Sequence, residues 1–167
     1  MFKVGDRVVY PMHGAGFIEG IVQQTVGGQL KDYYDIRIHG GNIRLKLPVQ
    51  NVGVIRLREV MNSAEAQEIL DYFKSLEIDQ SAPWGKRYKE NVEHLKTGDP
   101  KEVVGVVKAL MLRDKAVGLS TGDRQVMVLS KNILCSELSL ALEKEMESLL
   151  GTLQGIVDET VENALSN

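Results

Sequence analysis

The residues whose types most suggest a chemical site lie in the stretch 83–89. Trp84 is the only tryptophan of the chain, and Lys86, Arg87 and Lys89 follow it together with Tyr88. Cationic side chains neutralise phosphates, and an indole stacks on a base or wedges beside it, so the stretch suits a contact with nucleic acid. The same residues also fit a core tryptophan at the start of a helix whose other face carries solvated cations. The stretch alone favours that second interpretation.

Combinations of side chains that could support catalysis do not stand out in the sequence. The three histidines, His13, His39 and His94, are not at metal-ligand spacing, and no carboxylate pair flanks them. Gly14 and Gly16 follow a predicted strand and hint at a phosphate loop, but no helix and no Lys-Ser/Thr pair completes that motif. The sequence therefore predicts a protein that is not an enzyme and that needs neither a cofactor nor a metal ion.

The net charge of −3 hides an uneven distribution of charge. Residues 1–61 carry eight Lys/Arg against five Asp/Glu, residues 62–120 carry nine against ten, and residues 121–167 carry three against eight. A protein that coats nucleic acid is usually basic overall, and this chain is not. Any contact with DNA must therefore be local, and another interaction must supply much of the affinity.

Composition and length bound the class of protein and the compartment. The 167 residues suffice for one good-sized domain or two small ones. No run of about 18 apolar residues exists, and the first residues lack the apolar core of a signal peptide. We therefore expect no membrane segment and a cytoplasmic location. Cys135 is the only cysteine, which predicts no intrachain disulfide and an ordinary apolar position on a helix.

The first part of the chain has the short apolar alternations and Gly-rich turns of a β domain. Tyr34, Ile36 and Ile38 share one face of a predicted strand, and Gly20 suggests a bulge in the strand before it. In the following strand Ile43, Leu45 and Leu47 are expected to point inward. The five expected strands lie at residues 7–10, 17–26, 29–38, 42–47 and 52–55, with a tight turn at 13–16. They predict a small, strongly bent barrel of the SH3 or Tudor kind.

From Asn62 onward the apolar period becomes helical. Asn62 and Glu65 form a capping box, Asp99 precedes Pro100 as a second cap, and Ser120 is a third. The expected helices cover residues 63–76, 83–97, 100–117, 121–140 and 149–165, and the break between the last two lies within residues 139–146. The prediction is an α+β protein of two domains, a β domain at 1–60 and an all-α bundle of about five helices at 61–167.

The order of these modules and several local strings resemble the CarD family of bacterial transcription regulators, also called CdnL. The opening match is residues 2–6 (FKVGD), which continues through residues 9–14 (VYPMHG). The strongest helical match is residues 84–91 (WGKRYKEN), and weaker ones lie at residues 31–34, 46–48, 98–99, 113–114 and 118–120. The resemblance covers nearly the whole chain. The first module is also similar to the polymerase-interacting domain of transcription-repair coupling factors.

The resemblance implies a DNA contact in the helical module. Members of this family contact promoter DNA at the upstream edge of the transcription bubble, where a tryptophan wedges into the minor groove. Trp84 matches that position. The cations that match the family's DNA contacts are Lys86, Arg87 and Lys89, with Arg124 at the start of the fourth helix as a further candidate. Tyr88 joins this group because it lies in the same stretch.

The resemblance also implies that the β module binds the β subunit of RNA polymerase. The family's contact positions fall on Gln24 and Lys46. Some members carry arginine at both; glutamine has no charge for an ion pair, and lysine lacks the planar bidentate fork. By our own interpretation of the residues, an exposed strand at 42–47 could extend a partner's sheet by edge pairing, with Arg44 and Lys46 facing outward. Such tethering would raise the concentration of the helical module near DNA.

A second hypothesis is a protein–protein adaptor with no direct role on DNA. The acidic last third of the chain and the lack of overall basicity support it. Exposure of the Trp84 ring separates the two hypotheses, because a ring buried on all sides favours the adaptor. In either case we expect a monomer.

Overall fold

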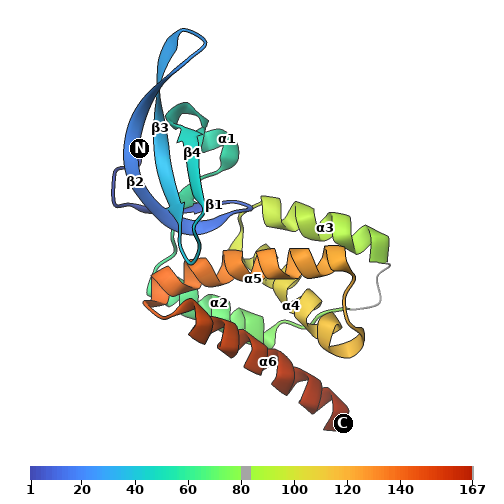
Figure 1. Ribbon diagram of the computed structural model, residues 1–167. Coiled ribbons are helices and arrows are strands. Elements are labelled where there is room, and N and C mark those ends of the chain that lie inside the picture. The colour runs from blue at the N-terminus through green and yellow to red at the C-terminus, as the bar shows by residue number, and fades with distance from the viewer. Residues whose placement is uncertain (80–83, 167) are drawn as a thin grey trace.

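The structure is a computed structural model that describes residues 1–79 and 84–166; the side chains of residues 84–86 lie outside the described part. A β-sheet unit at the N-terminus is followed by a helical unit, so the expected α+β architecture is confirmed (Figure 1). The predicted domain boundary at residue 60 falls in the short connection between the last strand and the first long helix. The predicted helix start at Pro83 lies outside the described residues.

The sheet is antiparallel and strongly bent, as the Gly-rich strands predicted. Its strands follow the order β4-β3-β2-β1-β5, with β1 at Arg7–Tyr10, β2 at Gly14–Val26, β3 at Gln29–Ile38, β4 at Arg44–Pro48 and β5 at Arg58–Glu59. Its core contains Val8, Ile18, Tyr34, Ile36, Ile38, Leu47 and Leu57. Ile43 is 51% exposed and precedes β4, so the prediction that it points inward is wrong.

Two glycine positions explain the course of β2. The register shifts between Ile18 and Gly20, which confirms the predicted bulge. The predicted turn at 13–16 is wrong, because β2 begins at Gly14 and the turn lies earlier, where the His13 amide donates to the Tyr10 carbonyl. A Cβ at Gly16 would lie 2.0 Å from the Arg37 carbonyl oxygen, so close pairing with β3 requires glycine there.

The predicted strand at 52–55 is also wrong. That segment forms the short helix α1, Val52–Ile55, after the 3-10 turn η1, Val49–Asn51. At the end of α1, Arg56 takes a left-handed conformation with φ 60°, and the Leu57 amide donates to the Val52 carbonyl. A run of four apolar residues is too short for periodicity to separate a strand from a helical turn.

The helical unit contains the expected long helices within the described residues. They are α2 at Ser63–Ser75, α3 at Trp84–Lys96, α4 at Pro100–Val117, α5 at Thr121–Leu142 and α6 at Met146–Ser166. The capping box of Asn62 and Glu65 forms, and the Asp99 and Ser120 side chains accept from backbone amides of α4 and α5. Glu143, with φ 53°, ends α5 inside the predicted interval.

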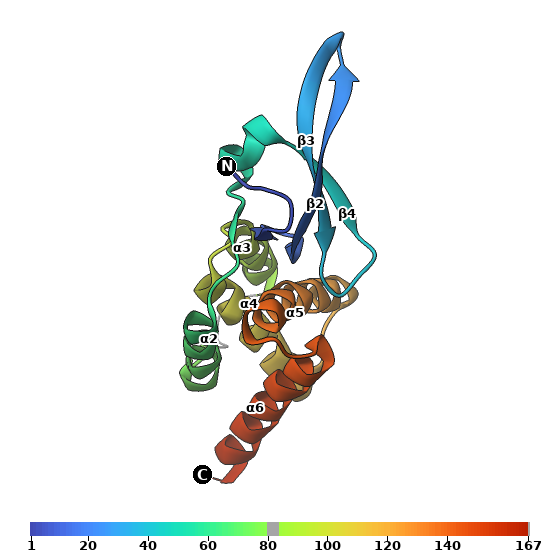
Figure 2. The ribbon, with the colours of Figure 1, turned by 90° about the vertical axis from the view of Figure 1, so that its left-hand side faces the viewer.

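The two units pack directly against each other along α5 (Figures 1 and 2). Val9, Ala15 and Leu140 form a shared apolar cluster. The Arg7 guanidinium donates to the Leu140 carbonyl at 2.7 Å, and the Ala15 amide donates to Ser136 Oγ at 2.9 Å. These contacts fix the orientation of the sheet on the bundle, which the sequence left open. The β2–β3 ribbon projects from one end and α6 from the other.

Candidate docking face and nucleic-acid interface

One face of the sheet gathers the residues expected to bind polymerase. Pairing places Gln24 opposite Lys31, Lys46 opposite Asp35, and Arg44 opposite Arg37. Because side chains alternate along a strand, these pairs and Tyr33 lie on the face away from the Tyr34 side of the sheet. We call this set, Gln24, Lys31, Tyr33, Asp35, Arg37, Arg44 and Lys46, the outer face.

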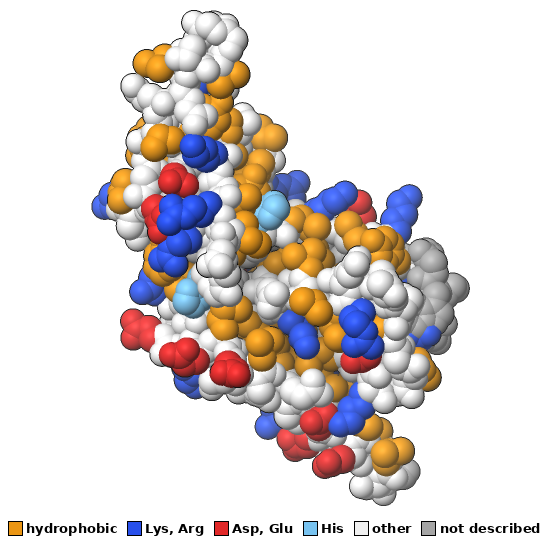
Figure 3. Space-filling view, in the orientation of Figure 1, with side chains coloured by type: hydrophobic (Ala, Val, Ile, Leu, Met, Phe, Trp, Pro, Cys, Tyr) orange, Lys and Arg blue, Asp and Glu red, His pale blue; other side chains and the backbone are white. Residues whose placement is uncertain are grey.

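The outer face carries mixed charge. Glu19, in the bulge of β2, pairs with Arg37 at 2.5 Å and with Arg44 at 2.9 Å. The Arg37 guanidinium also lies over the Phe17 ring, 5.3 Å from its centroid. Lys46 is exposed and forms no ion pair among the described residues. Figure 3 shows Lys and Arg side chains gathered over the sheet with acidic side chains among them. Lys46 therefore keeps a full charge for a partner, whereas Arg44 is partly neutralised.

The edge of the sheet next to this face is open within the described residues. β4 pairs with β3 on one side, and its other side carries no strand. The backbone groups on that side can pair with a strand of another protein. Sequence reasoning missed Val22 and Tyr33, which pair on the outer face next to Pro48 and add half-buried apolar area to it. The alternation of β3 and the matched string at 31–34 were the signals that could have found Tyr33.

The basic stretch forms the first turns of α3. Tyr88 is 47% exposed and Lys89 is exposed, whereas Arg87 is half-buried. Trp84 begins the helix, but its side chain and that of Lys86 lie outside the described residues, and so does the exposure of the Trp84 ring that separates the two hypotheses. Leu95, 1% exposed, anchors the other end of α3 in the core. The helix thus exposes Tyr88 and Lys89 to solvent near its start, while its C-terminal end is held in the core by Leu95.

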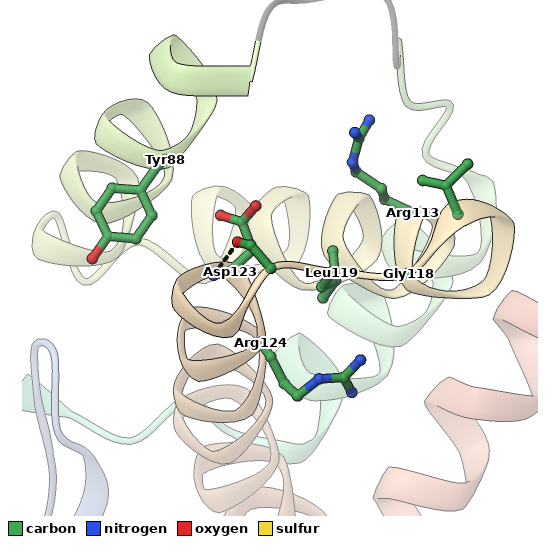
Figure 4. Close-up of a pocket in the computed structure, with 8 residues that line it drawn as sticks. Tyr88, Arg113, Gly118, Leu119, Asp123 and Arg124 are labelled. Carbon is green, nitrogen blue, oxygen red and sulfur yellow. Dashed lines mark hydrogen bonds between the residues drawn. The ribbon is translucent and has the colours of Figure 1, made fainter.

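A hollow lies between α3 and the junction of α4 with α5 (Figure 4). Its lining residues are Tyr88, Arg113, Val117, Gly118, Leu119, Ser120, Asp123 and Arg124. This arrangement brings Arg124 and α3 to the same hollow. The Arg124 guanidinium pairs with Asp114 at 3.0 Å, and in Figure 4 it points away from Tyr88.

Arg113 is the residue that sequence reasoning missed at this hollow. Burial lowers the pKa of its guanidinium, the positive charge of Arg87 lowers it further, and Asp123 acts in the opposite sense. Arginine still stays charged at neutral pH. Arg87, Arg113 and Arg124 therefore bring three cations near the first turn of α5, and Asp114 and Asp123 offset part of their charge. The matched string at 113–114 was the available signal.

Reactive chemistry finds little support in the described residues. Cys135 is fully buried, and burial raises its pKa to about 12, so its thiol is a poor nucleophile. His94 pairs with Glu102 at 3.1 Å, and His39 bonds Ser139 Oγ at 2.9 Å. Among residues 1–79 and 84–166, no group of three or more His, Cys, Asp or Glu side chains is arranged to hold a metal ion. Across the same ranges, every helix is too short or too polar to cross a bilayer.

A bent sheet with an open edge, packed on a bundle with a basic helix, is the architecture of a two-unit binding protein. Comparison with known proteins makes this specific. Residues 2–61 match the family model of the CarD-like/TRCF RID domain, and residues 68–154 match that of the CarD C-terminal domain. A Bacillus subtilis (strain 168) protein named "Putative transcription factor YdeB" is 33% identical over 151 residues, which span 89% of this chain and 99% of that protein.

The chain therefore belongs to the CarD family, and the resemblance inferred from its motifs is confirmed. Membership of this family supports a role in the regulation of transcription through interaction with RNA polymerase.

Proposed function

We propose that the protein docks its outer face and the β4 edge on the β subunit of RNA polymerase and stabilises the open promoter complex. In this role Trp84 wedges into the minor groove at the upstream edge of the bubble. Lys86, Arg87, Tyr88, Lys89 and Arg124 contact the DNA beside it. Such work belongs in the bacterial cytoplasm, on polymerase at the nucleoid.

The observation that carries the proposal is the separation of two different surfaces on one rigidly packed molecule. Gln24, Arg44 and Lys46 share an exposed sheet face beside an open edge. The basic turns of α3 lie on the other unit, which α5 holds against the sheet. Docking by the first surface would present the second at a high local concentration, which explains how a chain of net charge −3 acts on DNA.

The energetic scale of a wedge suits this role. Unstacking a base step costs a few kcal/mol, and a side chain that fills the gap favours open DNA only by its differential contact. A gain of about 2 kcal/mol would shift the opening equilibrium by between one and two decades. A single indole is therefore sufficient to change the lifetime of an open complex.

The test is Trp84→Ala in an open-complex lifetime assay with purified polymerase. We expect a lifetime shortened by about one to two decades at unchanged affinity for polymerase. Trp84→Phe keeps a smaller ring, so its open-complex lifetime should lie between those of the wild type and of Trp84→Ala. Lys46→Glu is the complementary variant, because it should weaken polymerase binding and lose the effect on DNA at the same time. An unchanged lifetime for Trp84→Ala with retained polymerase binding contradicts the wedge.

An adaptor that binds proteins and leaves DNA alone is the second candidate. The observation in its favour is α6, which carries Glu147, Asp158, Glu159 and Glu162 but neither Lys nor Arg. Recovery of a partner other than polymerase, by the full-length protein immobilised through its N-terminus, would support this function if Trp84→Ala also left promoter opening unchanged. The expected monomer can be checked in the same preparation by light scattering.

A further inference from the structure

A partly buried ion pair joins the sheet to the bundle. The guanidinium of Arg58, in β5, binds the carboxylate of Glu137, on α5, through two hydrogen bonds of 2.7 Å each. Glu137 is 3% exposed. A bidentate pair of this kind fixes both distance and angle between its partners. It is therefore a rigid connection between the two units, unlike the exposed ion pairs of the outer face.

The same two side chains also hold two further segments. Arg58 Nε and Nη2 donate to the Gly98 carbonyl at 3.2 and 3.0 Å. Glu137 Oε2 accepts from the Met61 amide at 2.9 Å. Groups from β5, from the connection to α2, from the segment after α3 and from α5 thus meet around the buried Glu137 carboxylate. Every polar group named here has a partner, which is what a charged pair needs when it is taken out of water.

The contact at Gly98 fixes the end of α3. Gly98 has φ +71°, and a Cβ there would lie 3.0 Å from Pro11 Cγ in the turn between β1 and β2. Gly98 lies two residues beyond Lys96, the last residue of α3, and its amide donates to the Leu95 carbonyl of the last turn at 3.4 Å. Arg58 therefore holds the segment that closes the C-terminal end of α3, while the basic stretch lies at the opposite end.

We propose that Arg58 is a positioning residue, through which the sheet unit sets the direction of α3. This inference rests on the proposed function for its consequence, because the start of α3 is the part that would meet DNA. The helix has 13 residues, so its start lies about 20 Å from its held end at the usual rise per residue. A tilt of about 10° at Gly98 would displace the start of α3 by about 3 Å over that length. That is close to the height of one base in a stack.

The direction of α3 can be measured without any assay of function. Val54→Cys, at an exposed position of α1, and Lys89→Cys, at an exposed position near the moving start of α3, provide two sites for spin labels, while Cys135 is fully buried and its raised pKa makes its thiol a poor nucleophile. Double electron–electron resonance on the full chain should give one narrow distance. Arg58→Met and Glu137→Gln should broaden or shift it, and Arg58→Lys should give an intermediate width, because lysine keeps the charge and loses the fork.

Leu153→Ala is the matched control. Leu153 is fully buried on α6 in the helical core, so its truncation lowers the melting temperature without touching the contacts of Arg58. It should leave the distance narrow. The proposal is overturned if the distance distribution of Arg58→Met has the same width and the same mean distance as those of the wild type and of Leu153→Ala. If Arg58→Met does not fold, Arg58→Lys and Glu137→Gln decide in the same way.

The consequence is tested on the same variants with polymerase. Arg58→Met should retain polymerase affinity, since its side chain lies away from the outer face, and should shorten the open-complex lifetime by about one decade. A changed distance with an unchanged lifetime would overturn the coupling to DNA. If the wild-type protein itself leaves the lifetime unchanged, the proposed function fails, and the distance measurement still decides whether Arg58 positions α3.

Discussion

Lys108 should be among the most costly positions to change in the helical unit. Its side chain is 1% exposed, and its ammonium donates to the carbonyls of Phe73, Lys74 and Leu76 at 2.6, 3.2 and 2.6 Å. It also lies 5.6 Å from the centroid of the Phe73 ring. These carbonyls end α2, where the helix offers them no amide. The lysine therefore closes the C-terminus of one helix from the middle of another.

The cost of Lys108→Met follows from these contacts. Methionine keeps the aliphatic stem and removes all three donors, which leaves at least two short hydrogen bonds to a charged group unmade. Each is worth about 1.5–3 kcal/mol. The gain from no longer burying an ammonium offsets part of that loss. We expect a net loss of about 3 kcal/mol, a large share of the usual 5–15 kcal/mol of domain stability.

Urea unfolding followed by circular dichroism measures this loss. With a typical m-value near 2 kcal/mol per molar, the midpoint should fall by about 1.5 M. Lys115→Met is the control, because it is the same substitution on the same helix and removes only a solvent-exposed pair with Asp158, worth about 0–1 kcal/mol. If the midpoint of Lys108→Met falls no further than that of Lys115→Met, the capping role assigned to Lys108 is refuted.

Two further predictions concern the sheet unit. Burial, then the charges of Arg37 and Arg7, lower the pKa of His39 below 6.5, against an opposing effect of Glu145. As the pH falls, His39 therefore takes up a proton in the unfolded chain before it does so in the folded protein. The contribution of His39 to stability should be complete above about pH 6.5 and should be lost on acidification. Thermal unfolding should show a smaller fall in melting temperature on acidification for His39→Gln than for the wild type. Gly16→Ala should lower the free energy of unfolding by about 3 kcal/mol through its clash with the Arg37 carbonyl. Gly41→Ala has open space around the new methyl group and should lower it by well under 1 kcal/mol. Equal losses in urea unfolding would contradict the close packing of Gly16 against β3.

The helices were predictable because their signals are local. The caps at Asn62, Asp99 and Ser120 act within a few residues, and the structure forms each of them. The sheet was less predictable where tertiary contacts decide. Gly14 belongs to a strand because β1 and α5 lie against it, and the segment 52–55 is helical although its residues favour strands.

The candidate site shows the same division. The basic stretch at α3 and the alternation at Arg44 and Lys46 could be found in the sequence because each lies within one element. The contact of Arg58 with Glu137 joins residues 79 positions apart, and no local pattern announces it. Lys108 could have been noticed, since it interrupts an apolar helix face and a cation there must find acceptors.

The shared cluster of Val9, Ala15 and Leu140 has a consequence for how the protein is dissected in the laboratory. A fragment containing only the helices would keep Glu137 but lose Arg58, and with it the bidentate pair that joins the two units. It would also bare apolar side chains that the sheet now covers. Either unit expressed alone would therefore not reproduce its structure in the whole chain, and point variants of the whole chain are better suited to experiments.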